Sequence, residues 1–205
     1  MTMETRQFKP ELREQPDTPA MGAGHFLVFN QETELWKGFR EKVDPGALDN
    51  VMDDDVRVLV NHDSNLIVAR TSKGTAKLSK DETGGVIEWQ FPDTTAGRDL
   101  LENMRNGNID GMSFGFTVKD DKLERNKETG EVVRTIMKLE RLYDASPVVF
   151  PAYQQTDTQL RAEYRTELES RPDWPKEQTE SPNDDLAIKQ QQKHLKLRIS
   201  INKNK

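Results

Sequence analysis

The sequence predicts an α+β protein whose core is a β-barrel-like set of antiparallel strands surrounded by a few helices, with flexible polar termini. Short runs of β-branched and aromatic residues recur between Phe26 and Leu160, and Gly, Asn and Asp residues typical of turns separate them. Only two segments have the spacing of apolar residues that favours a helix. Both ends of the chain are polar and rich in Pro, Glu and Gln.

The composition limits the class of protein. A chain of 205 residues suits one domain with tails, and a hydrophobic content of 33% must be concentrated to build a core. The net charge of -6 argues against a general nucleic-acid binder, which needs Lys and Arg to neutralise phosphates. The lack of cysteine excludes a thiol nucleophile, a disulfide framework and a zinc–thiolate site. Since no apolar run is long enough to cross a bilayer or form a signal peptide, we expect a soluble intracellular protein without a membrane partner.

Seven segments have the composition and alternation of strands: residues 25–30, 56–63, 66–70, 75–79, 86–91, 112–118 and 132–139. The turn-prone trio Asp63-Ser64-Asn65 is expected to separate the second of these from the third. The polar loops 80–85 and 119–131 each predict a hairpin. A last apolar segment covers residues 143–153 and is stopped by Pro151.

Two segments predict helices. Residues 44–52 suit a short helix, because Asp44 is a good N-cap and Pro45 fits the first helical position. Residues 94–107 suit a longer helix that ends at Gly107. One face of that helix is apolar and comprises Leu100, Leu101 and Met104.

The domain boundaries follow from polarity. Residues 1–22 read as a flexible arm, residues 23–161 as the folded domain, and residues 162–205 as a charged tail that we expect to be largely disordered. The tail is first acidic and then basic, with six Lys or Arg and no acid in its last 17 residues. This segregation of charge suggests either a solvated tail or a docking segment.

Residues 111–115, Gly-Met-Ser-Phe-Gly, match the G-x-S-x-G pattern of serine hydrolases. An α/β-hydrolase nucleophile needs a strand before the serine and a helix after it, whereas a helix precedes Ser113 and a strand follows it. That fold also places its histidine after the serine, and the only such histidine is His194 in the basic tail. The α/β-hydrolase interpretation therefore fails. Ser113 is either a nucleophile in another fold or an ordinary serine in a strand.

His62 is the histidine best placed to act as a base. It lies where an apolar strand ends and a turn begins, whereas His25 lies within an apolar strand and His194 in the tail. A lone histidine at a strand end is more often structural than catalytic. His62 and Ser113 therefore carry no functional assignment on their own.

Four stretches must be considered together: "GFREKVDPGALD", "VLVNHDSNLIVARTSKGTAKLSKDETG", "FPDTTAGRDLLENMRNGNIDGMSFGF" and "LYDASPVVFPAYQQT". In this order they resemble the prohead maturation protease family of tailed bacteriophages, over about residues 23–161. The most specific parts are the His of "NHD", the Ser of "DGMSFGF" and the acidic residue two positions before the serine of "DASPVVFPAY".

The resemblance implies that Ser113 is a nucleophile, His62 its general base and Asp144 the third member of a triad. The family often has Glu where this chain has Asp144. Glu140, four residues earlier, is the alternative third member if the strand register differs. The family is itself distantly similar to the herpesvirus assembly protease, a β-barrel surrounded by helices. The herpesvirus enzymes use a second histidine as third member, and this sequence has none suitably placed.

The resemblance further implies a serine endopeptidase of phage capsid assembly, located within the procapsid in the host cytoplasm. Its substrate would be the scaffold protein or the N-terminal scaffolding segment of the major capsid protein, and then the protease itself. A homodimer is a further expectation. The alternatives are a non-catalytic scaffold or assembly chaperone that retains the fold, and a hydrolase of esters.

We expect neither a cofactor nor a metal. The sequence lacks a Walker loop, a dinucleotide fingerprint and an H-E-x-x-H motif. Three consecutive acids, Asp53-Asp54-Asp55, fit a solvated turn better than a metal site. Arg141 is expected to form a surface ion pair, with positive charge near the site as the alternative.

Overall fold

The computed structural model describes residues 10–14, 19–150 and 158–176. The elements in chain order are β1 (Glu11–Arg13), β2 (Met21–Val28), β3 (Thr33–Trp36), β4 (Phe39–Val43), β5 (Arg57–Val60), β6 (Asp63–Arg70), a 3-10 turn η1 (Thr71–Lys73), β7 (Ala76–Lys80), β8 (Gly84–Gln90), α1 (Thr95–Arg105), β9 (Gly111–Arg125), β10 (Val132–Val148) and α2 (Thr158–Glu169). The described chain is therefore mostly β with two α-helices, which confirms the predicted α+β class.

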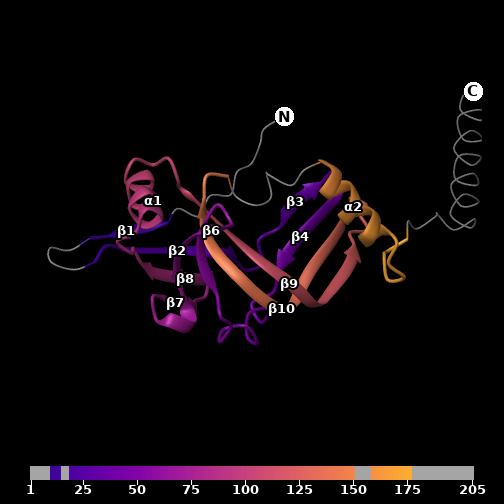
Figure 1. The fold of residues 1–205 in the computed structure, drawn as a ribbon. Helices are drawn as coiled ribbons and strands as arrows, with labels where there is room; N and C mark the ends of the chain where they lie inside the picture. The colour runs from indigo at the N-terminus through magenta and orange to yellow at the C-terminus, as the bar shows by residue number, and fades with distance from the viewer. Residues whose placement is uncertain (1–9, 15–18, 151–157, 177–205) are drawn as a thin grey trace, which may run out of the picture. The chain divides into compact units, whose positions relative to one another are not determined.

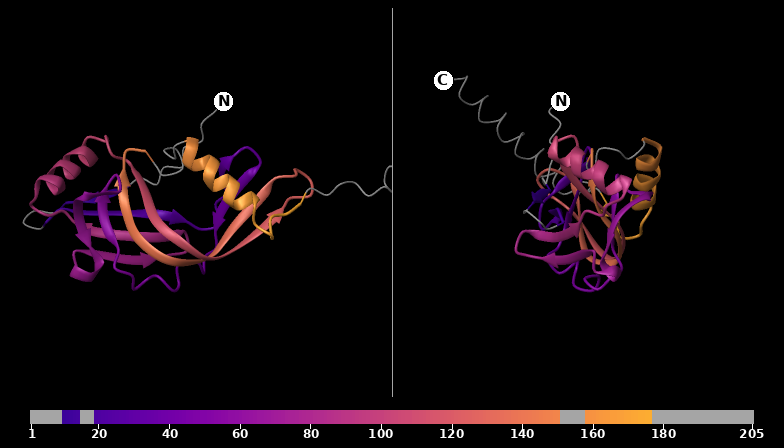
Figure 2. Two further views of the ribbon diagram at one scale, coloured as in Figure 1. Left: turned by 45° about the vertical axis from the view of Figure 1, so that its right-hand side comes forward. Right: turned by 60° about the vertical axis from the view of Figure 1, so that its left-hand side comes forward.

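The strands form two sheets. A four-stranded antiparallel sheet has the order β1-β2-β8-β7, and a six-stranded sheet has the order β3-β4-β10-β5-β6 with β9 also paired to β10. Figures 1 and 2 show α1 beside the four-stranded sheet and α2 beside β3 and β4, with β9 and β10 running between them. Among the described residues, the hydrogen-bonded ladders leave two open sheets where the sequence predicts one barrel-like core. The pairings are antiparallel except for those of β10 with β4 and β5, which are parallel.

Strand β10 is the centre of the larger sheet. β9 pairs with it along nearly its whole length, so β4 and β5 share the opposite edge, β4 near its start and β5 at Asp144. The segment between β4 and β5 bonds to the part of that edge which lies between them. Asp44 N–H donates to the carbonyl of Ile136 (2.9 Å), and Leu139 N–H donates to the carbonyl of Ala47 (3.0 Å).

These bonds explain why the helix predicted over residues 44–52 is wrong. The segment forms successive turns with i to i+3 bonds, for example from Ala47 N–H to the carbonyl of Asp44 (2.9 Å). Its backbone groups bond to β10, and Ala47, Leu48 and Val51 are completely buried. Tertiary contacts therefore override a local helical signal that is only about two turns long.

The other helix and the hairpins are confirmed. Thr94 caps α1, because its side-chain oxygen accepts a hydrogen bond from Gly97 N–H (3.1 Å). Gly107 follows the helix with a φ of +70° that favours glycine. β7 and β8 form one hairpin and β9 and β10 the other, although the second pair extends well into the polar stretch 119–131. No helix in the described part of the chain combines the length and apolarity needed to cross a membrane.

One hydrophobic cluster lies between the sheets and α1. Its largest completely buried members are Trp89, Leu48, Ile87, Leu100, Ile136, Leu139 and Leu142. Most of these residues belong to segments that the sequence identifies as apolar. The chain therefore concentrates its limited hydrophobic content in this one core.

A second, smaller cluster packs α2 against β4 and against the end of the β9–β10 pair where β9 ends and β10 begins. Phe39, Val132 and Leu168 are its buried members, and Trp36 stacks on Phe39 at 4.2 Å between ring centroids. Leu168 and Trp174 contribute to this cluster, although they belong to the segment 162–205 that the sequence assigns to the tail. Residues 177–205 of the tail, with His194, and residues 1–9 and 15–18 of the expected arm lie outside the described residues.

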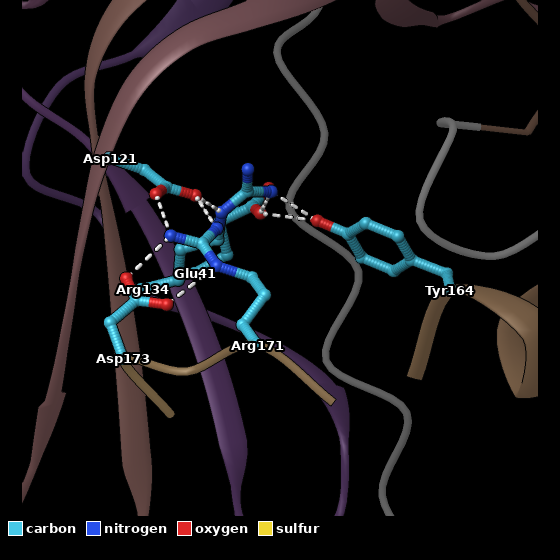
Figure 3. A network of polar contacts seen from close by, with 6 residues as sticks. All are labelled: Glu41, Asp121, Arg134, Tyr164, Arg171 and Asp173. Atoms are coloured by element: carbon cyan, nitrogen blue, oxygen red, sulfur yellow. Dashed lines mark hydrogen bonds and ion pairs between the residues drawn. The ribbon is translucent and has the colours of Figure 1, made fainter. Parts of the chain in front are cut away.

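A network of charged side chains joins α2 and the residues after it to the sheet (Figure 3). Arg134 on β10 bonds to Asp121, to Tyr164 of α2 and to Glu41, the last at 2.9 Å. Arg171 donates two bonds to Asp121, at 2.7 and 2.8 Å. Arg134 and Glu41 are buried, so each charge depends on the others for compensation.

Asp121 makes the stability of this region dependent on pH. Burial raises the pKa of its carboxyl, but hydrogen bonds from Arg171 and Arg134 outweigh that effect and hold the pKa below its ordinary value. The stabilisation is therefore complete above the unfolded-state pKa of about 3.9, and it is lost as the pH falls through the lower folded-state pKa.

We accordingly expect the free energy of unfolding in urea to fall more in wild type than in Asp121→Asn when the pH is lowered from about 6 to about 3. Asp120→Asn is the matched control, because Asp120 is the exposed neighbour of Asp121. Equal pH dependence in the two variants would show that Asp121 has no such role.

Candidate active site

Two paired strands present four small or polar residues on one face. β9 contributes Ser113 and Gly115, and β10 contributes Asp144 and Ser146. In the ladder, Ser113 lies opposite Ser146 and Gly115 lies opposite Asp144. Residues two apart on a strand share a face, and so do directly opposed residues on paired strands. The four positions therefore form a two-by-two block.

His62 reaches this block from the turn between β5 and β6. Val60 pairs with Asp63, so Asn61 and His62 alone connect the two strands. Their φ angles are +53° and +61°, and positive φ at both central residues is what a type I′ hairpin turn requires. The tight turn fixes where the imidazole leaves the sheet.

The turn predicted at residues 63–65 is therefore wrong by two positions. Leu59 pairs with Ile67 while the next residue of β5 pairs with Asp63, so the trio lies in an irregular, bulged start of β6. Asn65 N–H donates to the Asp63 carboxylate (2.8 Å), which is the local bond that makes such residues turn-prone. The turn-prone composition of this trio therefore marks a bulge in β6 and not the turn itself.

Asn61 anchors the turn on the end of β10. Its N–H donates to the carbonyl of Pro147 (3.1 Å), and its side-chain oxygen accepts a bond from Val149 N–H (2.8 Å). A left-handed conformation costs a residue with a side chain about 1 kcal/mol, and Asn tolerates it better than most. These bonds offset that cost and hold His62 beside β10. The Asn-His pair was a signal that our sequence analysis did not use.

The structure brings Ser113, His62 and Asp144 into one hydrogen-bonded row, here called the Ser–His–Asp cluster. His62 Nε2 lies 2.9 Å from Ser113 Oγ, and His62 Nδ1 lies 2.6 Å from Asp144 Oδ1. Ser113 and Asp144 are buried, whereas the imidazole is partly exposed. An ionised carboxylate can only accept, so Nδ1 carries the proton and Nε2 is left to accept one from the serine.

Gly115 makes room for the carboxylate. A Cβ atom at this position would lie 2.4 Å from Asp144 Oδ2, closer than any real Cβ contact. Only glycine therefore leaves room for the Asp144 carboxylate in this position.

Ser146 is a further member of the site that our sequence analysis missed. It is completely buried, and its Oγ lies 2.6 Å from Asp144 Oδ1. Its Oγ also accepts a bond from Leu59 N–H on β5 (3.1 Å). The available signal was its spacing, since a residue two positions after Asp144 on a strand must share its face.

Other candidate residues lie apart from the cluster. Glu140 is exposed, and the carboxylate that contacts His62 belongs to Asp144. The Arg141 guanidinium lies over the ring of Tyr143, 5.0 Å from its centroid. His25 pairs with Asp81 through Nε2 (2.9 Å) on the smaller sheet.

Two of the three consecutive acids, Asp54 and Asp55, have partners within the chain. Asp54 accepts a bond from Leu142 N–H (2.8 Å), so it caps the edge of β10. Hydrogen bonds from Arg70 and then Ser72 hold the pKa of Asp55 well below its usual range. Within the described ranges no three His, Cys, Asp or Glu side chains are grouped so that they could hold a metal ion.

A hydroxyl, an imidazole and a carboxylate in this order form the arrangement found in the triads of serine hydrolases on several unrelated folds. A family model described as caudovirus prohead serine protease matches residues 9–170. The chain therefore belongs to that family, as the four quoted stretches predict. Comparisons with curated proteins and with solved structures found no match, so the similarity to the herpesvirus assembly protease stays a prediction.

Proposed function

We propose that the chain is a serine endopeptidase in which Ser113 is the nucleophile, His62 the general base and Asp144 the residue that orients His62. The observation that carries the proposal is the pair of bonds made by His62, 2.9 Å to Ser113 Oγ and 2.6 Å to Asp144 Oδ1. Both distances lie within the reach that proton transfer requires. Membership of a serine protease family supports the same roles.

The chemistry follows from these contacts. A serine hydroxyl is a weak nucleophile, so His62 Nε2 takes the proton from Ser113 Oγ as the oxygen attacks the peptide carbonyl. The imidazolium then donates that proton to the leaving amine, and an acyl-enzyme on Ser113 remains. Water repeats the attack with His62 again as base, which releases the acid and regenerates the hydroxyl. Asp144 stays ionised and stabilises the imidazolium in both steps.

The family indicates where this activity is used. A prohead protease acts in the capsid precursor, so the proposed substrates are the scaffold protein or the N-terminal scaffolding segment of the major capsid protein, within the procapsid in the host cell. Cleavage of the protease itself, and a homodimer as its assembled form, belong to the same proposal. Confinement in a closed shell would restrain an enzyme that could otherwise cleave its substrates before assembly.

The first test is covalent labelling of the purified protein by a fluorophosphonate probe. We expect intact mass to show one adduct per chain in wild type and none in Ser113→Ala, because the probe reacts with an activated serine hydroxyl. Peptide mapping should place the adduct on Ser113. Thr117→Val is the matched control on the same strand, and it should be labelled like wild type.

Substrate class is tested by co-expression with the capsid and scaffold proteins. Cleavage of either protein by wild type but not by Ser113→Ala supports the capsid protease. Labelling and ester turnover without cleavage of either protein would indicate an ester hydrolase. An unlabelled wild type that still supports assembly would indicate a non-catalytic scaffold or assembly chaperone.

A further inference from the structure

We infer that Ser146 is a positioning residue that holds the Asp144 carboxylate in the orientation His62 needs. The inference rests on the proposed function and extends it by one residue outside the Ser–His–Asp cluster. It is carried by the hydrogen bonds of Ser146 and by its complete burial.

The direction of each bond is fixed by chemistry. Leu59 N–H can only donate, so it occupies an acceptor position of Ser146 Oγ (3.1 Å). The ionised carboxylate of Asp144 can only accept, so the Ser146 hydroxyl proton must point to Oδ1 (2.6 Å). Asp144 Oδ1 therefore accepts two bonds, one from Ser146 and one from His62 Nδ1–H.

This arrangement joins two strands at the site. Ser146 belongs to β10, and Leu59 belongs to β5, which is the strand that leads into the turn with His62. The hydroxyl thus connects the backbone that carries the imidazole to the carboxylate that orients it. Two bonds to one oxygen, with Gly115 beneath Oδ2, restrict rotation of the carboxylate. An Asp144 side chain held only by His62 would lack this restriction.

The test compares variants that keep or remove the hydroxyl. Ser146→Ala is expected to slow fluorophosphonate labelling of Ser113 by about 10- to 100-fold, the effect of losing one hydrogen bond to a charged group. With a cleavable peptide, kcat should fall while KM stays close to that of wild type. Ser146→Thr should recover most of the rate, whereas Ser146→Val, which has the shape of threonine without its hydroxyl, should not.

Thr117→Val is the control for removing a hydroxyl from this sheet. In the described chain Thr117 Oγ1 is buried and makes no hydrogen bond, so its loss should leave the labelling rate unchanged. Thermal unfolding of each variant reports whether the fold survives.

A second readout does not depend on catalysis. In the Ser113→Ala background, the proton shared by His62 Nδ1 and Asp144 should give a downfield NMR resonance. The resonance should persist in Ser146→Thr and move upfield or broaden in Ser146→Ala and Ser146→Val.

The outcomes separate the inference from the proposed function. If wild type is labelled and Ser146→Ala is labelled equally fast, or if Ser146→Thr and Ser146→Val behave alike, Ser146 is only a packing residue. If wild type is not labelled, the proposed function fails, and the NMR comparison still decides whether Ser146 orients Asp144.

Discussion

Replacing His62 with asparagine is expected to lower kcat/KM for a peptide substrate by on the order of 10^6-fold, the loss typical of removing the base of a serine protease triad. Asparagine has no basic nitrogen to take the proton from Ser113 Oγ. Asparagine also tolerates the positive φ of this position, so the turn between β5 and β6 should be retained. The measurement is steady-state hydrolysis of a peptide identified from the co-expression experiment, with circular dichroism to show that the fold is kept.

His25→Asn is the matched control for this variant. His25 also hydrogen-bonds an aspartate, Asp81, but its strand β2 belongs to the four-stranded sheet, whereas Ser113 lies on β9. His25 takes no part in the hydrogen bonds that join His62, Ser113 and Asp144. We expect its kcat/KM to equal that of wild type. If His62→Asn were as active as His25→Asn, His62 would not be the general base.

Gly115→Ala is expected to lower kcat/KM by on the order of 10^4-fold, close to the loss caused by removing the carboxylate of a triad. The added methyl would lie 2.4 Å from Asp144 Oδ2, so the carboxylate must move away from His62 or β9 must move away from β10. The substitution adds only one methyl group, so a large loss of activity would point to this single contact with Asp144. Labelling by the fluorophosphonate should slow in parallel.

A double-mutant cycle identifies the cause of that loss. Once Asp144 is alanine, the methyl of Gly115→Ala has no carboxylate to displace. The double variant should therefore be as active as Asp144→Ala alone. A further loss in the double variant would mean that alanine at position 115 acts by distorting the sheet and not through Asp144.

The sequence predicts three residues of the candidate site, Ser113, His62 and Asp144, through the family resemblance, and it gives no role to Ser146. The period-two alternation around Ser113 correctly indicated a strand, and the match of "NHD" and "DASPVVFPAY" to a known family pointed to His62 and Asp144. The distance between these residues could not be predicted, since 51 positions separate His62 from Ser113 and 82 separate it from Asp144. Only the pairing of β9, β10 and β5 makes them neighbours.

The errors have a common physical origin. The segment 44–52 has helical signals, but its backbone groups are taken by an edge of β10 that lies far along the chain. The trio at 63–65 has turn signals, but the register between β5 and β6 uses it as a bulge. The role of Gly115 likewise depends on which residue of β10 lies opposite it. Strand register depends on residues that are far apart in the chain, so local sequence patterns do not predict it.

The topology of the larger sheet has a consequence for synthesis on the ribosome. β4 and β5 have no ladder with each other, and both pair with β10, the last strand of the sheet in the chain. During translation from the N-terminus, the sheet therefore lacks its central strand until β10 has emerged. The same strand carries Asp144 and Ser146. A nascent chain consequently holds His62 and Ser113 before it holds the carboxylate, so the Ser–His–Asp cluster cannot form until β10 has emerged.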